Sequence, residues 1–387
     1  MKYFDENTIE KIRRGYYTAV YFNRTKEILR REGNLEAATM QIFQKKEGSI
    51  LGGVVEVREL LNMATGYFEG ESWINKSGEL EVRSLVDGDR LDSWETVMHI
   101  SGPYAYFAHL ESLYLGILAR RTLVATNTRK CVEAAGKTPI IFFGDRFDYF
   151  LNQEGDGYAA KIGGASAICT EAMEQGFGKE AVGTIPHALI ALNKGDTVKA
   201  AELFHKYYAD INLIALVDFD NDCAGTSLAV ARKLGKKLWG VRLDTAGEII
   251  DKSIQNRHSD QAKRVEESLA NARKLKQVER SLDFARDDAK KARDDIRGVN
   301  PRLVRLVRNA LDKEGFGYVR IVVSGGFYPE KIKIFSREKV AVDAYGVGSA
   351  IIAGENDFTA DIVKVEGKEI AKVGREYKEN MRLRKLL

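Results

Sequence analysis

Hydrophobic residues in the second part of the chain gather in short runs that alternate with longer stretches of mixed polarity. Seven runs follow residue 112: Thr122–Ala125, Pro139–Phe143, Ala181–Thr184, Leu213–Val217, Leu238–Val241, Val319–Val323 and Val340–Tyr345. They hold few charges, as expected of strands buried on both faces, and helical stretches lie between them. The pattern predicts parallel strands joined by helices.

The first 111 residues have a different pattern. Asn23–Glu32 predicts a helix, and Gly66–Ile74 and Glu79–Leu85 predict strands on either side of a turn at Asn75–Gly78. A further short strand is predicted at Glu95–Ile100. These elements indicate an α+β domain with its own sheet.

The C-terminal residues, 351–387, are predicted to complete that first domain. Asp361–Val373 indicates a hairpin around Glu366-Gly367 whose strands could pair with the N-terminal sheet. The last ten residues, KENMRLRKLL, favour a basic helix or a frayed tail.

Polar, charged and glycine residues follow the hydrophobic runs. Thr-Asn-Thr-Arg-Lys follows Ala125, Gly-Asp-Arg follows Phe143, and Ser-Gly-Gly follows Val323. In a (β/α) barrel the carboxyl ends of the strands carry the active site. We therefore predict an α/β fold with an irregular (β/α) barrel over residues 112–350. The alternative is an open doubly wound sheet with ordinary polar loops.

Residues 251–297 do not fit the barrel pattern. The segment is rich in charge, and Gly and Pro are absent between Gly247 and Gly298. Apolar residues recur at heptad spacing: Val278, Leu282, Ala285, Ala289, Ala292 and Ile296. This predicts a charged helical insertion. It is either a solvated excursion from a barrel loop or a contact between subunits.

Composition narrows the class of protein. The 387 residues are 44% hydrophobic and 30% charged, with a net charge of +4, which is typical of a soluble protein and too balanced to indicate nucleic-acid binding. Three cysteines without a CxxC pair argue against a zinc site or a disulfide framework. The charged N-terminus is unlike a signal peptide, and no apolar run is long enough to span a membrane. We expect a cytoplasmic protein.

Two glycine clusters are candidates for phosphate binding. Ser324-Gly325-Gly326 and the run Gly346, Val347, Gly348 and Ser349 each follow a strand near the end of the predicted barrel. Glycine allows backbone N–H groups to approach an anion closely, and barrels often bind phosphate after their last two strands. The alternative is a pair of tight turns without a ligand.

Charged residues at two other strand ends are candidates for binding a sugar phosphate. Arg242 and Asp244 lie two positions apart, so they point to the same side of an extended segment, where they could bind phosphate and ribose hydroxyls. Asp218, Asp220 and Asp222 could serve Mg²⁺-pyrophosphate or a developing positive charge. A structural ion pair and an N-cap are the alternatives.

A histidine and several cations complete the predicted site. His187 follows the run that ends at Thr184, where it could bind phosphate, transfer a proton or accept a phosphoryl group. Phe143 could stack on an aromatic ring, although a Phe at this place is often a core residue. The predicted positive charge comes from three residues: Arg129, Lys130 and Arg146.

The ordered motifs resemble those of nicotinate phosphoribosyltransferase, a type II phosphoribosyltransferase related to the quinolinate and nicotinamide enzymes. They are ATNTRK (125–130), FFGDR (142–146), GTIPHAL (183–189), LVDFDND (216–222), GVRLDT (240–245), IVVSGGF (321–327) and YGVGS (345–349). The resemblance implies that nicotinate and phosphoribosyl pyrophosphate (PRPP) are the substrates, with Mg²⁺ accompanying the pyrophosphate and ATP coupling in many members.

The resemblance also implies roles for individual residues. Phe143 would stack on the pyridine, with Tyr21 of a partner subunit on the other face, and Arg146 would approach the pyridine carboxylate or pyrophosphate. His187 matches the histidine that ATP phosphorylates, and Arg242 and Asp244 would hold the phosphoribosyl group. The amides of the two glycine clusters would bind the 5′-phosphate. A homodimer or higher homo-oligomer is implied, with the active site near the subunit interface.

Two alternatives stay open at this point. One is quinolinate phosphoribosyltransferase, which also decarboxylates its substrate and which ATNTRK resembles. Two features favour nicotinate. The quinolinate enzyme lacks the histidine of GTIPHAL, and it needs more cations because quinolinate is a dicarboxylate. The other is a catalytically silent nucleotide-binding scaffold that assembles through the 251–297 segment. Arg242, Asp244 and His187 argue against it.

Overall fold

A computed structural model describes residues 3–255 and 296–387 of the chain. These residues form two compact units. The first consists of residues up to 130 together with 145–180 and 351–387, and the second of residues 131–144 and 181–350. The predicted domain boundary at residue 112 falls at the start of a long helix. The predicted helical insertion, 251–297, lies mostly outside the described residues.

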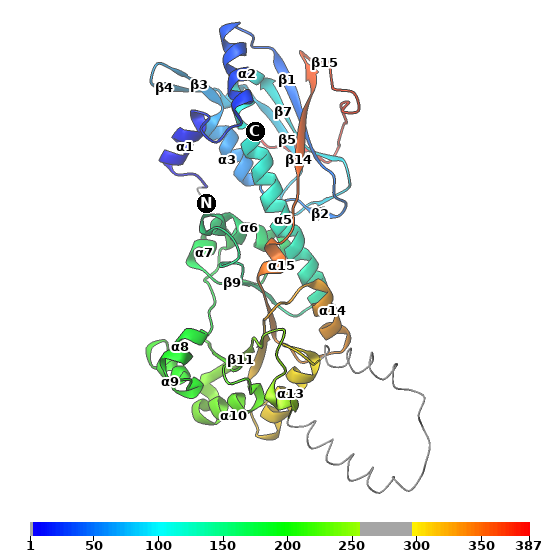
Figure 1. Ribbon diagram of the computed structural model, residues 1–387. Coiled ribbons are helices and arrows are strands. Elements are labelled where there is room, and N and C mark those ends of the chain that lie inside the picture. Colours follow the sequence, from blue (N-terminus) through cyan, green and yellow to red (C-terminus); the bar gives the residue numbers. More distant parts are fainter. Residues whose placement is uncertain (1–2, 256–295) are drawn as a thin grey trace, which may run out of the picture. The chain divides into compact units, whose positions relative to one another are not determined.

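An antiparallel sheet forms the framework of the first unit. Its six strands lie in the order β15-β14-β1-β7-β5-β16. Their bounds are β1 (Ala37–Gln44), β5 (Glu81–Ser84), β7 (Glu95–Pro103), β14 (Phe358–Val365), β15 (Lys368–Glu369) and β16 (Arg384–Lys385). Figure 1 shows β14 running beside β1, where the register places Ala38 opposite Val365.

The C-terminal hairpin confirms the sequence prediction. Glu366 and Gly367 form the turn between β14 and β15 with φ of 48° and 73°, a left-handed pair that suits a tight hairpin. The prediction of a helix or frayed tail at the C-terminus is wrong, because β16 pairs with β5.

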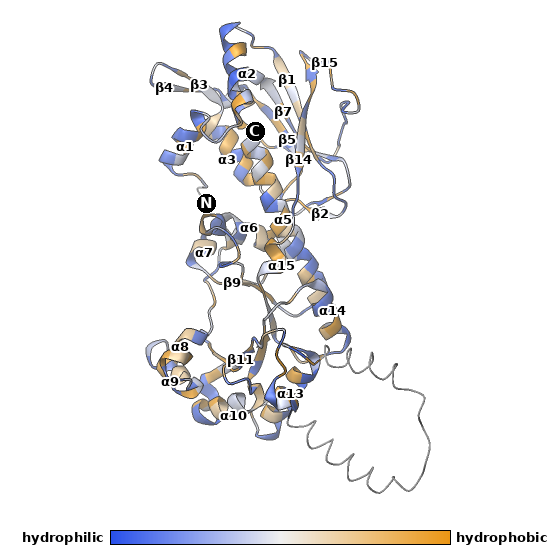
Figure 2. Ribbon diagram, viewed as in Figure 1, coloured by the Kyte–Doolittle hydropathy of each residue, from blue (hydrophilic) through white to orange (hydrophobic). Residues whose placement is uncertain are grey.

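The described residues of the first unit also form helices. They are α1 (Glu6–Arg13), α2 (Val20–Arg31), α3 (Val54–Ala64), α4 (Tyr104–Phe107), α5 (Glu111–Ala135), α6 (Gln153–Gly163) and α7 (Glu171–Phe177), with single 3₁₀ turns η1 (Ser77–Glu79), η2 (Ala108–Leu110) and η3 (Phe150–Asn152). Apolar residues recur along α3 at helical spacing and give this helix its orange stretches in Figure 2. Five of them are buried: Val54, Val57, Leu60, Leu61 and Ala64. They join strand residues such as Ile42 and Val82 in one hydrophobic core.

The remaining strands of the first unit are short: β2 (Ser49–Ile50), β3 (Gly66–Glu69), β4 (Ser72–Asn75), β6 (Arg90–Leu91) and β9 (Ala167–Ile168). β2 pairs with β6, and β3 with β4. The predicted single strand Gly66–Ile74 is wrong, because Gly70, with φ of 58°, folds it into the β3–β4 hairpin. The predicted helix at Asn23–Glu32 and the strand at Glu95–Ile100 are present as α2 and β7.

The second unit contains a parallel sheet with the strand order β10-β11-β12-β13-β8. The strands are β8 (Ile140–Phe142), β10 (Leu213–Leu216), β11 (Leu238–Leu243), β12 (Arg320–Val323) and β13 (Ala344–Val347). The helices are α8 (His187–Leu192), α9 (Thr197–Tyr207), α10 (Cys223–Leu234), α13 (Pro301–Lys313), α14 (Pro329–Arg337) and α15 (Ser349–Ile352), with the 3₁₀ turn η4 (Gly235–Lys237). Within this unit, β13 is the last strand along the chain and pairs with β8, the first, which is the adjacency that a barrel requires.

Five of the seven predicted strands are present, and two are not. Thr122–Ala125 is part of the 25-residue helix α5, since a short apolar run alone does not distinguish a strand from a buried helical turn. Ala181–Thr184 lies in an irregular segment, where the neighbouring Ile185 N–H donates to the Ile214 carbonyl at the edge of β10. The described helices include none that could cross a membrane.

A buried ion-pair network ties α5 to α3 and α6. The guanidinium of Arg121 donates to Glu56 at 2.8 Å and to Asp156 at 3.0 Å. All three side chains are nearly inaccessible to solvent, with exposed fractions of 12%, 7% and 5%. Removing one partner of such a network leaves an uncompensated buried charge.

We predict that Arg121→Met lowers the free energy of unfolding by about 3–5 kcal/mol, because the buried Glu56 loses its cation and the buried Asp156 keeps only Arg120. Arg14→Met is the control, since Arg14 pairs with Glu10 and Glu71 in an exposed position and should cost no more than about 1 kcal/mol. Urea denaturation measures both. Equal losses in the two variants would contradict the network's importance.

Candidate functional site

Strand β11 brings an arginine and an aspartate to the carboxyl edge of the parallel sheet. Arg242 lies near the end of β11, and its Nη2 donates to Asp244 Oδ2 at 2.9 Å. Its Nη1 donates to the Thr184 hydroxyl at 2.6 Å. The buried Ser324, which follows β12, donates its hydroxyl to Asp244 Oδ1 at 2.7 Å. The predicted pair is thus fixed from both sides.

Phe143 lies in the same cluster. Its N–H donates to the Val347 carbonyl at 2.8 Å, and the guanidinium carbon of Arg242 is 5.6 Å from its ring centroid. A Cβ on Gly346 would lie 2.5 Å from the ring, so the ring packs directly on the bare backbone of β13. The structure therefore gives Gly346 a packing role, whereas its contact with phosphate stays a prediction.

The Ser324-Gly325-Gly326 turn has a backbone that requires glycine. Gly325 and Gly326 have φ of 83° and 71°, and Gly326 is exposed just before α14. A Cβ on Gly325 would press on Asp244 Oδ1 at 3.3 Å. Gly348 and Ser349 follow β13 and lead into α15, with Ser349 exposed.

His187 is the first residue of α8, directly after Pro186. Its Nε2 lies 3.2 Å from Asp218 Oδ2, and the histidine side chain is 47% exposed while the aspartate is 8% exposed. Burial raises the pKa of Asp218; His187 opposes this shift and the negative charge of Asp244 adds to it. Asp218 Oδ1 is buried and lacks a hydrogen-bond partner among the described residues.

These contacts join several of the predicted residues of the second unit into one cluster. Asp218 connects His187 with Asp244 electrostatically, and Asp244 connects Arg242 with Ser324. The residues come from the carboxyl ends of β8, β10, β11 and β12 and from the irregular segment before α8. Charged, hydroxyl, aromatic and backbone N–H groups thus converge at the edge where parallel α/β folds bind ligands.

The other two aspartates of the 216–222 motif face elsewhere. Asp222 is the N-cap of α10, accepting from the Gly225 N–H at 3.1 Å and from the Ser253 hydroxyl at 3.0 Å. This confirms the N-cap alternative for one of the three. Asp220 is exposed and lines a pocket together with Asp222 and Lys252. Its role in binding substrate stays a prediction.

Four predicted residues belong to the first unit. Tyr21 is 59% exposed on α2, and Arg146 is exposed with its guanidinium over the Phe147 ring. Arg129 and Lys130 lie within α5, so the prediction that they follow a strand is wrong. Arg129 donates to the Ile162 carbonyl at 3.2 Å.

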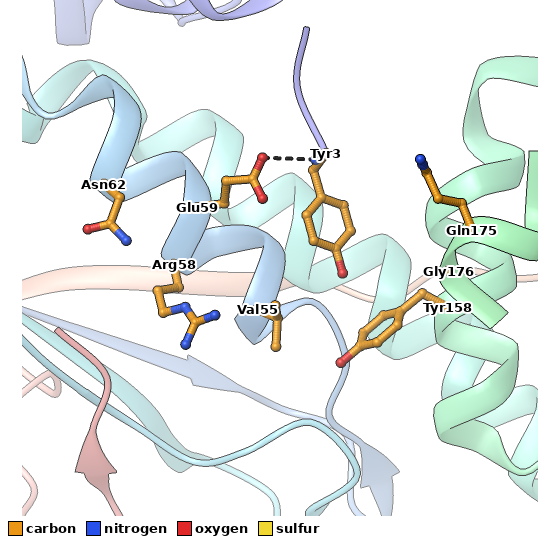
Figure 3. A pocket seen from close by; sticks show the side chains of 8 residues that line it. All are labelled: Tyr3, Val55, Arg58, Glu59, Asn62, Tyr158, Gln175 and Gly176. Carbon is orange, nitrogen blue, oxygen red and sulfur yellow. Dashed lines mark hydrogen bonds between the residues drawn. The ribbon is translucent and has the colours of Figure 1, made fainter. Parts of the chain in front are cut away.

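A pocket of the first unit lies between α3 and the α6–α7 segment (Figure 3). Its lining includes Tyr3, whose N–H donates to Glu59, and Tyr158, whose hydroxyl donates to Asp87. Arg58 of α3 also borders it. None of the predicted site residues lines this pocket.

The sequence also suggested carboxylates for Mg²⁺. The described residues contain no group of three or more His, Cys, Asp or Glu side chains that could hold a metal. Asp218 and Asp244 lie in the cluster singly, and Mg²⁺ is often bound by one or two carboxylates plus substrate phosphates. The donor set therefore fits a metal that arrives with pyrophosphate.

Two residues of the cluster were missed in the sequence. The ring centroid of Phe219 lies 6.4 Å from that of His187. Lys331 of α14 donates to the Gly325 carbonyl at 3.2 Å. The available signal was a lysine in the first turn of a helix that begins with proline, where acidic residues are usual.

Comparison with known proteins identifies the fold and the family. The model of the quinolinate phosphoribosyl transferase N-terminal domain matches residues 19–122. The crystal structure of nicotinate-nucleotide pyrophosphorylase from Pyrococcus furiosus is 30% identical, with a TM-score of 0.74 over 97% of this chain and 81% of that one. The fold matches that of this solved structure along nearly the whole chain. The chain belongs to the type II phosphoribosyltransferase family.

Two further similar proteins are both named as nicotinate phosphoribosyltransferases. A nicotinate phosphoribosyltransferase of Mycobacterium tuberculosis is 26% identical over 311 residues, which are 78% of this chain. The chain spans 57% of the length of that relative. The human nicotinic acid phosphoribosyltransferase structure, 14% identical with a TM-score of 0.62, covers 91% of this chain and 75% of that one and shares the fold.

Asp218 gives a prediction about stability and pH. Its pKa is raised in the folded protein, so the ionised carboxylate opposes folding at neutral pH. We expect Asp218→Asn to be more stable than the wild type at pH 7, and the advantage to shrink as pH falls toward the ordinary carboxylate value of 3.8. Urea unfolding at several pH values measures this.

Asp5→Asn is the control for that experiment. The N–H of Thr8 lowers the pKa of Asp5, which caps α1, so the Asp5 carboxylate stabilises the fold at neutral pH and loses this effect as pH falls. The two variants should therefore shift stability at pH 7 in opposite directions. A destabilised Asp218→Asn at pH 7 would show that the bond to His187 outweighs the burial of the charge.

Proposed function

We propose that this protein is a nicotinate phosphoribosyltransferase, which converts nicotinate and PRPP into nicotinate mononucleotide and pyrophosphate. The observation that carries the proposal is the linked set Thr184–Arg242–Asp244–Ser324 beside the Phe143 ring. It combines a cation, a carboxylate and an aromatic face within one strand edge. Its place in the type II phosphoribosyltransferase family supports this chemistry.

In the proposed reaction the chain positions two substrates for a displacement at C1 of the ribose. The lone pair of the pyridine nitrogen forms the N–C1 bond while the C1–O bond breaks and its electron pair leaves with pyrophosphate. The developing positive charge on the ribose is stabilised by negative groups such as Asp244 and Asp218. Mg²⁺ bound to the pyrophosphate would neutralise part of its leaving charge.

Positioning accounts for most of the rate in this proposal. Arg242 would bind phosphoribosyl oxygens with the guanidinium edge that Thr184 and Asp244 hold in place. The Phe143 ring, fixed against Gly346, offers a flat apolar surface for the pyridine. Each group is held by a neighbour in the cluster, so little reorganisation is needed when the substrates bind.

His187 is proposed to couple the reaction to ATP. Its Nε2 lies near Asp218, which leaves the other ring nitrogen, Nδ1, as the nucleophile for a terminal phosphoryl group. In that step the N–P bond forms and the P–O bond to ADP breaks. The half-exposed ring is accessible for this transfer.

Assembly and location belong to the same proposal. Aromatic residues are exposed near the start of α2, among them Tyr16, Tyr17 and Tyr21. We propose that a homodimer or higher homo-oligomer covers them and that Tyr21 reaches the pyridine of a partner subunit. The substrates are soluble metabolites, which fits the expected cytoplasmic location.

Quinolinate is the second candidate substrate, and the name of the Pyrococcus furiosus relative favours it. The His187–Asp218 pair and the name of the Mycobacterium tuberculosis relative favour nicotinate. PRPP is supplied with each acid in turn, and the mononucleotide and CO₂ are measured. We expect product from nicotinate alone; CO₂ release from quinolinate would transfer the assignment to the decarboxylating enzyme. Binding of nicotinate mononucleotide without turnover of either acid would indicate a scaffold.

We predict that Arg242→Met lowers kcat/KM for PRPP by about a hundredfold or more, because a charge-assisted contact to the phosphoribosyl group is lost. Arg232→Met is the control, since Arg232 pairs with Glu314 at an exposed place on α10. It should leave kcat/KM within a factor of about two. Steady-state assays with saturating nicotinate decide between the outcomes.

We predict that His187→Ala abolishes the stimulation of the reaction by ATP but leaves part of the PRPP-dependent synthesis. The imidazole is the proposed phosphoryl acceptor, whereas the transfer itself needs no proton from it. Rates are compared with and without ATP. Equal loss of both activities would mean that His187 positions substrate instead.

A further inference from the structure

Helix α14 begins with an unusual distribution of charge. Lys331 is its third residue, after Pro329 and Glu330. The first turn of a helix carries partial positive charge, so a lysine there is disfavoured by the helix dipole. A negative group nearby would offset this cost.

The surroundings of Lys331 do not supply that negative group. Its Nζ donates to the Gly325 carbonyl at 3.2 Å and lies 4.4 Å from the centroid of the Phe327 ring. In the part of the chain that the structure describes, Lys331 forms no ion pair, and burial alone lowers the pKa of its ammonium to about 8. The protein thus holds a partly desolvated amine without a counter-ion.

The other cation of the cluster differs in this respect. Arg242 is neutralised by Asp244, to which it donates at 2.9 Å. An anion that binds at Arg242 therefore meets a guanidinium whose charge Asp244 already balances. At the Gly325–Gly326 turn it meets exposed backbone, the start of α14 and the uncompensated charge of Lys331.

We propose that Lys331 binds the phosphate monoester of the phosphoribosyl substrate at the Ser324-Gly325-Gly326 turn and supplies the positive charge that this dianion needs. The inference rests on the proposed function and adds a residue to it. The carbonyl of Gly325 holds the amine at the turn, and the dianion provides the counter-ion that the protein lacks. A phosphate group, rather than a carboxylate, also uses the several N–H donors of a glycine turn.

Proton linkage follows from this arrangement. Near pH 8 a fraction of the amine is neutral in the free protein, and a bound dianion favours the charged form. Binding of a phosphate monoester should therefore take up protons near pH 8, and affinity should fall as pH rises further.

The test uses ribose 5-phosphate as the probe and unphosphorylated ribose as its control, with the full chain and isothermal titration at pH 8. Lys331→Gln keeps a hydrogen-bond donor for the Gly325 carbonyl but removes the charge, and Lys331→Met removes both. Lys333→Gln, an exposed lysine on the same helix, is the matched control. Titration in two buffers of different ionisation enthalpy gives the protons taken up.

We expect Lys331→Gln to weaken binding of ribose 5-phosphate by about tenfold or more, as for the loss of one charged hydrogen bond, and to abolish proton uptake. Lys333→Gln should stay within a factor of about two of the wild type. Wild-type affinity in Lys331→Gln, or no preference of the wild-type protein for ribose 5-phosphate over ribose, overturns the inference. Failure of PRPP turnover with either acid would refute the proposed function, while the phosphate titration would still decide the role of Lys331.

Discussion

The carboxylate of Asp244 is the contact on which the arrangement of the strand edge depends. One oxygen accepts from Arg242 on the same strand end, and the other accepts from Ser324 after the neighbouring strand. Parallel pairing of β11 with β12, in which Leu243 lies opposite Val323, sets the distance between these two chain segments. The register between these two strands therefore determines where the Arg242 guanidinium and the Ser324-Gly325-Gly326 turn lie relative to each other. The packing of Phe143 over Gly346 adds an aromatic face to the same frame.

The cluster keeps several groups in states that do not favour folding. The pKa of Asp218 is raised by burial, and that of Lys331 is lowered by it. The proposed roles need the carboxylate of Asp218 and the ammonium of Lys331, which are the charged forms. Burying these charges costs free energy, and this cost lowers the stability of the fold. Such costs are acceptable where a ligand later supplies the opposite charge. The first unit treats its buried charges differently, because Arg120 and Arg121 balance the carboxylates of Glu56 and Asp156 without a ligand.

The sequence predicted five of the seven barrel strands, and the two failures have different physical reasons. Strands such as Leu238–Val241 and Val319–Val323 are bounded by charged or glycine residues that break the run, so their ends are visible in the pattern. The run Thr122–Ala125 is too short to distinguish a strand from a turn of helix. Only the residues on either side of it show that it belongs to helix α5. The Ala181–Thr184 segment resembles a strand in composition but is irregular, and the next residue, Ile185, donates its N–H to the Ile214 carbonyl of β10. The pairing of His187 with Asp218, and the place of Lys331, depend on which helix turn faces which strand. Spacing along the chain does not contain that information.

The antiparallel sheet of the first unit has a consequence for the order of folding during synthesis. β1 lies between β7 and β14, and its residue Ala38 is paired with Gly102 on one side and Val365 on the other. The nearer neighbour emerges from the ribosome soon after β1, whereas the farther one follows after most of the parallel sheet. One edge of β1 therefore stays unpaired while the intervening chain is translated, with backbone groups that can attract another strand. Chaperones that shield nascent chains would act at this edge.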